Sequence, residues 1–392
     1  MNLRVVFVLL FCATYATAKL HHFSMIKRKH KHSKPLHRRV HKRHQNALKA
    51  KYGLSTISKV NAVTNSGSST SAASSGIQQT SSLENYYDAE FLVTITLGEQ
   101  SFIVVPDTGS ADMWVPDASC NFCANSCQNH IFNRAKSKSF VNNGTSFSIT
   151  YGSGSAAGTT GSDTFKIGKM TVQNQTFGLA NTISSCSAYD GIWGLGFPSL
   201  SQLKTEPPFQ NLITQNQVEK SIFSFSLKTN TMIMGGSNSS LYYGELIYTP
   251  VTVASYWQFN LQTIDFSDGS CPRCSGNCTA IMDTGTSLIV GPSSDIMALN
   301  TQLGATFNST YDLWLVECAI ISTLPQLVLT IANTKFYIKP ETYVLNLGTV
   351  CASGLMDLSG ITFWIIGDVF LRQHYVEFDS TKQQMGIAPA LG

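Results

Sequence analysis

Short segments in which apolar and polar residues alternate run through the chain from about residue 85 to its end, separated by Gly, Asn and Ser. In Glu90–Leu97 and Ser146–Tyr151 the apolar side chains recur at every second position, which is the period of a strand with one buried face. Few stretches show helical periodicity, and the clearest of them are Gln210–Gln217 and Ser294–Leu303. The pattern predicts a mainly β protein.

One short motif occurs twice, each time at the end of an apolar run. Asp107-Thr108-Gly109-Ser110 returns 176 residues later as Asp283-Thr284-Gly285-Thr286, and more apolar residues follow both copies. A single Asp-Thr-Gly is a weak signal, because these residues form ordinary turns. Two copies in matching context predict two related lobes, each presenting a carboxylate at a tight turn. If the lobes face each other, Asp107 and Asp283 meet.

A second repeated pattern supports two related halves. Tyr189–Gly196 follows the first motif by about 80 residues, and Phe363–Asp368 follows the second at a similar distance. Both place bulky apolar residues before a Gly, which lets two backbones approach closely. We therefore expect one strand to pack behind each Asp loop.

The charges divide the chain into two parts. Residues 1–83 hold 14 of the 27 Lys and Arg, 7 of the 9 His and no acid, whereas the remainder has a formal net charge of −10. Residues 1–18 are typical of a signal peptide, with Arg4, an apolar stretch over Val5–Cys12 and small residues up to Ala18. That stretch is too short for a membrane span, and no later segment is long enough. Entry into the secretory pathway argues against nucleic-acid partners.

The predicted organisation has five parts. They are a signal peptide (1–18), a basic His-rich prosegment (19–59), a Ser/Thr-rich linker (60–84), an N-terminal lobe (85–250) and a C-terminal lobe (251–392). A basic segment can dock on an acidic domain electrostatically. Acid removes charge from the partner carboxylates and adds repulsion among the histidines, so we predict release of the prosegment at low pH. A metal site among these histidines lacks a defined ligand spacing.

Nine cysteines remain after Cys12 of the signal peptide, and an oxidising compartment would pair most of them. We expect Cys123 to pair with Cys186, leaving Cys271 free or exchanged with Cys274. A zinc site made from the first three cysteines is the alternative, although no suitable His spacing accompanies them. Three pairs are favoured by position: Cys120 with Cys127, Cys274 with Cys278, and Cys318 with Cys351.

Five Asn-x-Ser/Thr glycosylation sequons agree with secretion. They lie at Asn143, Asn174, Asn238, Asn277 and Asn308. Asn277 is inside the short cysteine loop, where access is expected to be poor.

From Asn85 to Gly392 the chain resembles the pepsin-like aspartic endopeptidases, a family that includes pepsin, gastricsin and cathepsin D and is made as zymogens. The resemblance implies a bilobal β fold with the active-site cleft between the lobes, and a secreted enzyme that hydrolyses internal peptide bonds at acid pH. Besides the two motifs, it rests on Trp114-Val115-Pro116, Tyr151–Ser155, Tyr256-Trp257-Gln258, Ser322–Pro325 and Ile366–Leu371.

Under this resemblance Asp107 and Asp283 are the catalytic pair. Two closely placed carboxyls do not easily both ionise, so their pKa values split and the pair shares one proton. The ionised member activates a water, and the protonated member hydrogen-bonds the scissile carbonyl. The remaining motif residues are expected to support the dyad through hydroxyl hydrogen bonds and an open backbone: Thr108, Gly109, Ser110, Thr284, Gly285 and Thr286.

The resemblance also assigns residues that cover and block the cleft. Tyr151, Gly152 and Ser153 match the flap that closes over the substrate, and the indole N–H of Trp114 is expected to steady the tyrosine. Lys51 and Tyr52 match a pair with which some family prosegments block the dyad. Extended peptides or unfolded proteins are the implied substrates and the chain's own prosegment an inhibitor, with no cofactor or metal. The protein is expected to be a monomer, secreted or in an acidic lysosome-like compartment.

Two departures from the family pattern flank the first aspartate. Pro106 replaces an apolar residue that has a backbone N–H. Asp112 stands where Asn is usual, and if unpaired it would raise the apparent pKa of the dyad. The main alternative function is a catalytically inactive, secreted peptide-binding protein on the same scaffold. Such relatives typically lose an Asp, a motif Gly or the flap Tyr, all of which this chain keeps. A cationic peptide released from residues 27–51 is a third possibility.

Overall fold

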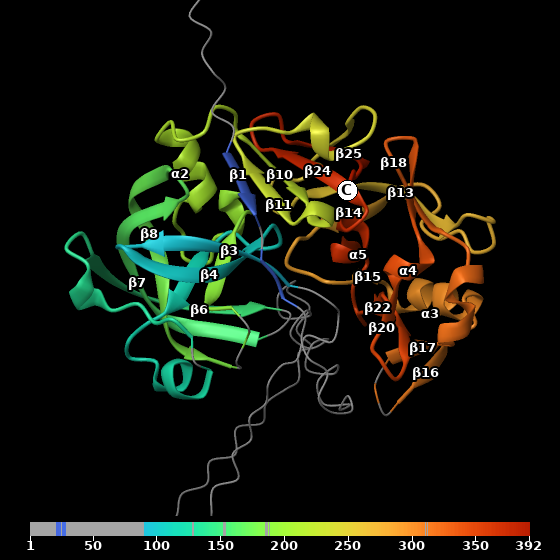
Figure 1. Cartoon of the computed structure of the whole chain (residues 1–392), viewed down its shortest axis with the longest axis horizontal. Helices are drawn as coiled ribbons and strands as arrows, with labels where there is room; N and C mark the ends of the chain where they lie inside the picture. Colours follow the sequence, from blue (N-terminus) through green and yellow to red (C-terminus); the bar gives the residue numbers. More distant parts are fainter. Residues whose placement is uncertain are drawn as a thin grey trace, which may run out of the picture.

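Two β-rich lobes lie side by side in the protein, one from each half of the chain, and a six-stranded sheet joins them (Figure 1). The structure, a computed structural model, describes residues 21–24, 26–28, 90–127, 129–151, 154–184, 187, 189–309, 311 and 313–392. The predicted signal peptide, the linker and most of the prosegment lie outside the described residues, as do Lys51, Tyr52, Gly152, Ser153 and Cys186.

The N-terminal lobe is built on an eight-stranded sheet. The first two of its long strands, β3 and β4, are joined by a two-residue turn in which Gly98 and Glu99 have φ angles of 50° and 65°. Burial alternates along the end of β6, at Phe147, Ile149 and Tyr151, as the sequence predicted. In spatial order the strands are β2 (Ile26–Arg28), β3 (Glu90–Leu97), β4 (Gln100–Asp107), β9 (Gly191–Gly194), β5 (Met113–Pro116), β8 (Met170–Ile183), β7 (Gly154–Ile167) and β6 (Val141–Tyr151).

The C-terminal lobe contains a seven-stranded and a four-stranded sheet. The larger sheet runs β19 (Thr334–Ile338), β18 (Leu327–Ile331), β13 (Gln258–Phe266), β14 (Cys278–Met282), β23 (Trp364–Ile366), β15 (Ile289–Gly291) and β22 (Leu355–Asp357). The smaller sheet runs β16 (Thr306–Asn308), β17 (Leu313–Val316), β21 (Cys351–Ser353) and β20 (Val344–Asn346).

A six-stranded sheet connects the lobes, because its strands come from both halves of the chain. It runs β1 (His21–Ser24), β11 (Thr231–Met234), β10 (Ile222–Ser226), β24 (His374–Asp379), β25 (Gln384–Pro389) and β12 (Ile247–Pro250). β1 pairs antiparallel with β11, and β2 pairs antiparallel with β3 of the N-terminal lobe. Two short strands from the predicted prosegment therefore form edges of two different sheets.

Helices are short and lie between the strands. The two predicted helical segments are present, with bounds that differ by a few residues. The α-helices of the described residues are α2 (Pro208–Thr214), α3 (Ser293–Gln302), α4 (Pro340–Tyr343) and α5 (Asp368–Leu371). No helix within the described ranges is long and apolar enough to cross a bilayer.

The two lobes repeat the same strand pairing around the Asp-Thr-Gly motifs. β4 runs parallel to β9 and β14 runs parallel to β23, so the strand predicted behind each motif is present. β5 and β15 then pair antiparallel with the far sides of β9 and β23. A Cβ on Gly194 would lie 2.3 Å from the backbone of Ala111, and one on Gly367 would lie 2.0 Å from the carbonyl oxygen of Thr286. These glycines therefore permit the close backbone approach that the sequence indicated.

Candidate active site

Asp107 is the last residue of β4, and its carboxylate is held by its own turn. The side chain is buried, with 2% of its surface exposed. The backbone N–H of Gly109 donates to Asp107 Oδ1 at 2.9 Å, and the Ser110 hydroxyl donates to Oδ2 at 2.6 Å. The two donors fix the plane of the carboxylate.

Asp283 follows β14 directly and is held in the same way. The N–H of Gly285 donates to Asp283 Oδ1 at 2.9 Å, and the Thr286 hydroxyl donates to Oδ2 at 2.7 Å. The side chain is fully buried. Each lobe thus presents a carboxylate oriented by one backbone donor and one hydroxyl donor.

The two carboxylates lie against each other's turns. A Cβ built on Gly109 would lie 2.5 Å from both carboxylate oxygens of Asp283. A Cβ built on Gly285 would lie 2.2 Å from Asp107 Oδ1. A side chain at either position would meet the opposite aspartate, so glycine is what allows the two turns to come together.

Thr108 and Thr284 tie the two turns to each other. Thr108 N donates to Thr284 Oγ1 at 3.0 Å, and Thr284 N donates to Thr108 Oγ1 at 2.9 Å. Each hydroxyl also donates across the interface, Thr108 to the carbonyl of Met282 at 2.9 Å and Thr284 to that of Pro106 at 2.7 Å. Four buried hydrogen bonds, each contributing about 0.5–1.5 kcal/mol net, hold the lobes in register at the aspartates.

The two departures near Asp107 leave this arrangement intact. Pro106 continues β4 opposite Trp193, and its carbonyl still accepts the Thr284 hydroxyl. Asp112 is buried but accepts hydrogen bonds from Ser201 and from two backbone N–H groups. These donors are neutral, so they hold the carboxylate in place without cancelling its charge, and burial raises the pKa of Asp112 itself although its hydrogen bonds oppose that shift.

Tyr151 ends β6 at the tip of the hairpin with β7. The indole N–H of Trp114 donates to its hydroxyl at 2.9 Å, which is the contact expected between these residues. Burial raises the pKa of Tyr151 well above its usual range, and the charges of Asp112 and Asp107 raise it further, so the phenol stays protonated. The hydroxyl therefore keeps a proton that it can donate.

A compact apolar group surrounds this tyrosine, and we call it the flap cluster. Its members come from the hairpin, from strands beneath it and from the segment after Pro198–Leu200. They are Trp114, Phe147, Ile149, Tyr151, Ala156, Ala180, Ile192 and Leu203, with Ile183 and Tyr189 packed against them.

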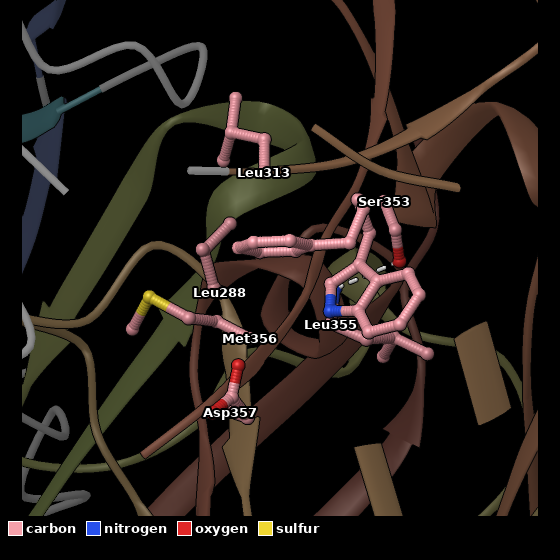
Figure 2. A pocket seen from close by; sticks show the side chains of 8 residues that line it. Leu288, Leu313, Ser353, Leu355, Met356 and Asp357 are labelled. Carbon is pink, nitrogen blue, oxygen red and sulfur yellow. Dashed lines mark hydrogen bonds between the residues drawn. The ribbon is translucent and has the colours of Figure 1, made fainter. Parts of the chain in front are cut away.

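The C-terminal lobe has a small apolar pocket close to the second motif. Figure 2 shows the side chains of Leu288, Leu313 and Met356 around this space. Its volume of about 10 Å³ would hold no more than one water molecule. Phe307, which also lines it, is 47% exposed on the β16–β17 hairpin.

The disulfides agree with the sequence in the C-terminal lobe and differ in the N-terminal lobe. Cys274 pairs with Cys278 and Cys318 with Cys351, as predicted, and Cys271 is free and buried. The predicted pairs of Cys120 with Cys127 and Cys123 with Cys186 are wrong, because Cys120 is bonded to Cys123.

A helical turn explains the difference. Ala124 N donates to the carbonyl of Cys120, so positions three apart lie side by side, and the Cα atoms of Cys120 and Cys123 are 5.3 Å apart. Cys127 lies about one helical turn beyond Cys123, since each residue of a helix rises about 1.5 Å, and it is also disulfide-bonded. All three sulfurs are consumed, which excludes the zinc alternative. Across the described ranges, no group of three or more His, Cys, Asp or Glu could hold a metal ion.

The sequon asparagines lie on the surface to different degrees. Asn143, Asn174 and Asn277 are exposed, the last contrary to the poor access expected inside its cysteine loop. Asn238 and Asn308 are half-buried, and their side-chain oxygens accept hydrogen bonds from Ser240 and Tyr311. Glycan attachment is proposed for the three exposed positions first.

The chain matches known proteins over the whole of the described two-lobed region. Residues 90–390 match the family model described as eukaryotic aspartyl protease. Pepsin A from Sus scrofa is 41% identical over 322 residues, covering 78% of this chain and 83% of that protein. Pepsin A from Bos taurus is 38% identical over 78% of this chain and 86% of its own. Pepsin-3 from Oryctolagus cuniculus is 38% identical, and the match covers 79% of this chain and 84% of that protein.

Proposed function

Because the chain belongs to the eukaryotic aspartyl protease family, and is thereby an aspartic-type endopeptidase, we propose that it cleaves internal peptide bonds at acid pH with Asp107 and Asp283 as its catalytic pair. The observation that carries this proposal is the opposition of the two carboxylates, each lying where a Cβ of the other turn's glycine would be. Both come from one chain, so a monomer suffices.

The chemistry follows from two adjacent carboxyls with different proton occupancy. One carboxylate removes a proton from a water held between the pair, and the other, protonated, hydrogen-bonds the carbonyl of the peptide to be cut. The water oxygen adds to the carbonyl carbon and forms a tetrahedral species without a covalent bond to the enzyme. The carboxyl that took the proton of the water then passes a proton to the peptide nitrogen as the C–N bond breaks, which releases an amine and a carboxylic acid. Ser110 and Thr286, each donating to an Oδ2 atom, keep the carboxylates aimed at that water.

Tyr151 is proposed to close over the bound peptide. Its hydroxyl is held by Trp114, and the hairpin of β6 and β7 can fold down on an extended chain. Closure would exclude water from the cleft and hold the scissile bond against both aspartates.

The enzyme is proposed to be made as a secreted zymogen whose basic prosegment blocks the cleft until acid releases it. Two features support this: β1 and β2 already pair with sheet edges of the two-lobed part, and the segment's positive charge complements the net charge of −10 beyond residue 83. Candidate blocking residues are Lys51 and Tyr52. A protein made in this way, with a signal peptide at residues 1–18, is proposed to be secreted or to reach a lysosome-like compartment.

Acidification of the purified full-length protein tests the whole proposal. We expect a drop from pH 7 to about pH 4 to produce cleavage between residues 29 and 89, followed by digestion of an unfolded protein such as reduced casein. Pepstatin should prevent both events. Mass spectrometry of the products and a fluorescent peptide assay would follow them. Digestion that persists under saturating pepstatin would contradict an aspartic mechanism.

His374 affects the lowest pH at which the protein stays folded. The side chain is 2% exposed, stacks on Phe370 with ring centroids 4.1 Å apart, and meets Phe336 edge-on. Burial lowers its pKa to about 4, although its Nδ1 hydrogen bond with the carbonyl of Phe370 opposes that shift. The folded protein therefore keeps His374 neutral where the unfolded chain would already be protonated.

We expect His374→Phe to make the protein more resistant to acid. Since the unfolded chain takes up this proton below about pH 6.5 and the folded protein only near pH 4, the histidine lowers the free energy of unfolding by about 3 kcal/mol across that interval, and by no more below it. Urea unfolding at pH 7 and pH 3.5, in an Asp107→Asn background that cannot digest itself, measures the difference. Equal acid-dependent losses with and without the histidine would refute it.

A further inference from the structure

Equivalent positions of the two motifs carry different side chains. Asp112 and Leu288 each lie five residues after the motif aspartate. The backbone carbonyl of each accepts a hydrogen bond from a glycine: Gly194 N donates to Asp112 at 2.9 Å, and Gly367 N donates to Leu288 at 3.1 Å. The backbone role is shared between the lobes, so the reason for a carboxylate at Asp112 must lie in its side chain.

That side chain gathers three donors from one short segment. Asp112 is 4% exposed. Its Oδ1 accepts from the Ser201 hydroxyl at 2.6 Å and from Leu203 N at 3.3 Å, and its Oδ2 accepts from Gln202 N at 2.7 Å. Ser201 Oγ accepts in turn from Thr205 N at 3.1 Å, so the hydrogen bonds that begin at Asp112 reach as far as Thr205. One carboxylate therefore fixes the backbone of residues 201–203.

The fixed segment belongs to the support of Tyr151. Leu203 is a member of the flap cluster, together with Trp114 and Tyr151. Asp112 is thus linked to the tyrosine through Leu203. The C-terminal lobe has Leu288 at the matching position, facing the small pocket.

We propose that Asp112 is a positioning residue for the flap: its carboxylate holds residues 201–203 against the flap cluster, and this support keeps Tyr151 in place over the cleft. The inference rests on the proposed function, in which Tyr151 closes over a bound peptide. Its effect is on capture and alignment of the substrate, and the carboxylate itself does not touch the reacting atoms.

Hydrogen exchange tests the hold without relying on activity. In an Asp283→Asn background, Asp112→Ala should speed exchange of the Gln202 and Leu203 amides about tenfold or more, since both lose their acceptor. Asp112→Asn keeps one oxygen, which can accept from Gln202 N, and its NH₂ can donate to Ser201, so exchange of the Gln202 amide should stay within about threefold of the parent, whereas the Leu203 amide, with the longer bond of 3.3 Å, loses its acceptor. Parental exchange rates in Asp112→Ala would overturn the proposal.

Kinetics on a peptide substrate then tests the consequence. Asp112→Ala should lower kcat/KM about 10- to 100-fold, with most of the change in KM, whereas Asp112→Asn should remain within about threefold of wild type. Asp117→Ala is the matched control, because Asp117 is equally buried in the same lobe and accepts from Ser119 and Arg134, outside the flap cluster. Its kcat/KM should change less than about threefold.

Each remaining outcome is decisive. Three results would each overturn the positioning role. The first is faster exchange in Asp112→Ala together with wild-type KM and kcat. The second is an Asp112→Asn variant as impaired as Asp112→Ala, and the third is an equal rise of KM in Asp117→Ala. If the wild-type protein cleaves nothing at any pH, the proposed function fails, while the exchange experiment still reports whether Asp112 holds the segment.

Discussion

Asp107→Asn and Asp283→Asn are each expected to lower proteolysis at acid pH by about 10²- to 10⁴-fold, the range that general acid–base catalysis contributes. Asparagine has nearly the same shape as aspartate, and its oxygen can still accept from Gly109 or Gly285. It cannot give up or take on the shared proton. Loss of one member therefore leaves a single carboxyl to do both the acid and the base work.

Initial rates of peptide hydrolysis between pH 3 and pH 6 measure this loss. The variants should also fail to process themselves, yet wild-type enzyme added in trace amounts should cleave their prosegments and leave the two-lobed part intact, which shows that this part is folded. Asp117→Asn, a buried carboxylate with its own partners Ser119 and Arg134, serves as the control and should stay within about threefold of wild type. Undiminished rates in either dyad variant would remove that residue from the mechanism.

The repeated patterns of the sequence were enough to predict the arrangement around the aspartates. Two copies of one motif, each followed about 80 residues later by apolar residues and a Gly, indicated two lobes with a strand behind each motif, and β9 and β23 are those strands. These features are local: alternation, turn chemistry and close approach at glycine can be read from a few neighbouring residues.

Features that depend on contacts between distant segments could not be read in this way. The hydroxyls of Thr108 and Thr284 donate across the lobes to the carbonyls of Met282 and Pro106, respectively, residues that no local pattern connects. Their one signal was that a threonine follows the aspartate in both copies. Similarly, the donors to Asp112 come from residues about 90 positions away, so the sequence near Asp112 gives no sign of its hydrogen-bond partners.

The error at Cys120 has a different origin. The spacing of the cysteines predicts a pair of Cys120 with Cys127, whereas the chain makes a helical turn there, and in such a turn positions three apart are neighbours. The C-terminal cysteines form no such turn, and Cys274, with a left-handed φ of 58°, pairs with Cys278 across a hairpin-like loop. The same spacing of three cysteines therefore gives two different pairings, decided by local backbone conformation.

Gly285→Ala is expected to abolish most activity although it adds a single methyl group far smaller than any catalytic side chain. The new Cβ would lie 2.2 Å from Asp107 Oδ1, a separation that real Cβ atoms do not adopt. Asp107 cannot easily rotate away, because Gly109 and Ser110 hold both of its oxygens. The turns must then move apart, and a displacement of about 1 Å at reacting groups costs on the order of 100-fold in rate.

We expect kcat/KM of Gly285→Ala to fall about 100-fold or more, with a parallel loss of pepstatin affinity, because the inhibitor needs both carboxylates in place. Gly109→Ala should behave alike, since its Cβ would lie 2.5 Å from both oxygens of Asp283. Gly386→Ala is the matched control: its Cβ would lie 2.8 Å from the ring of Tyr248, which is 44% exposed and can move at the cost of its hydroxyl's hydrogen bond to Glu377. Wild-type kinetics in Gly285→Ala would mean that the two turns are farther apart in the working enzyme, and the opposed carboxylates would then no longer support the proposed mechanism.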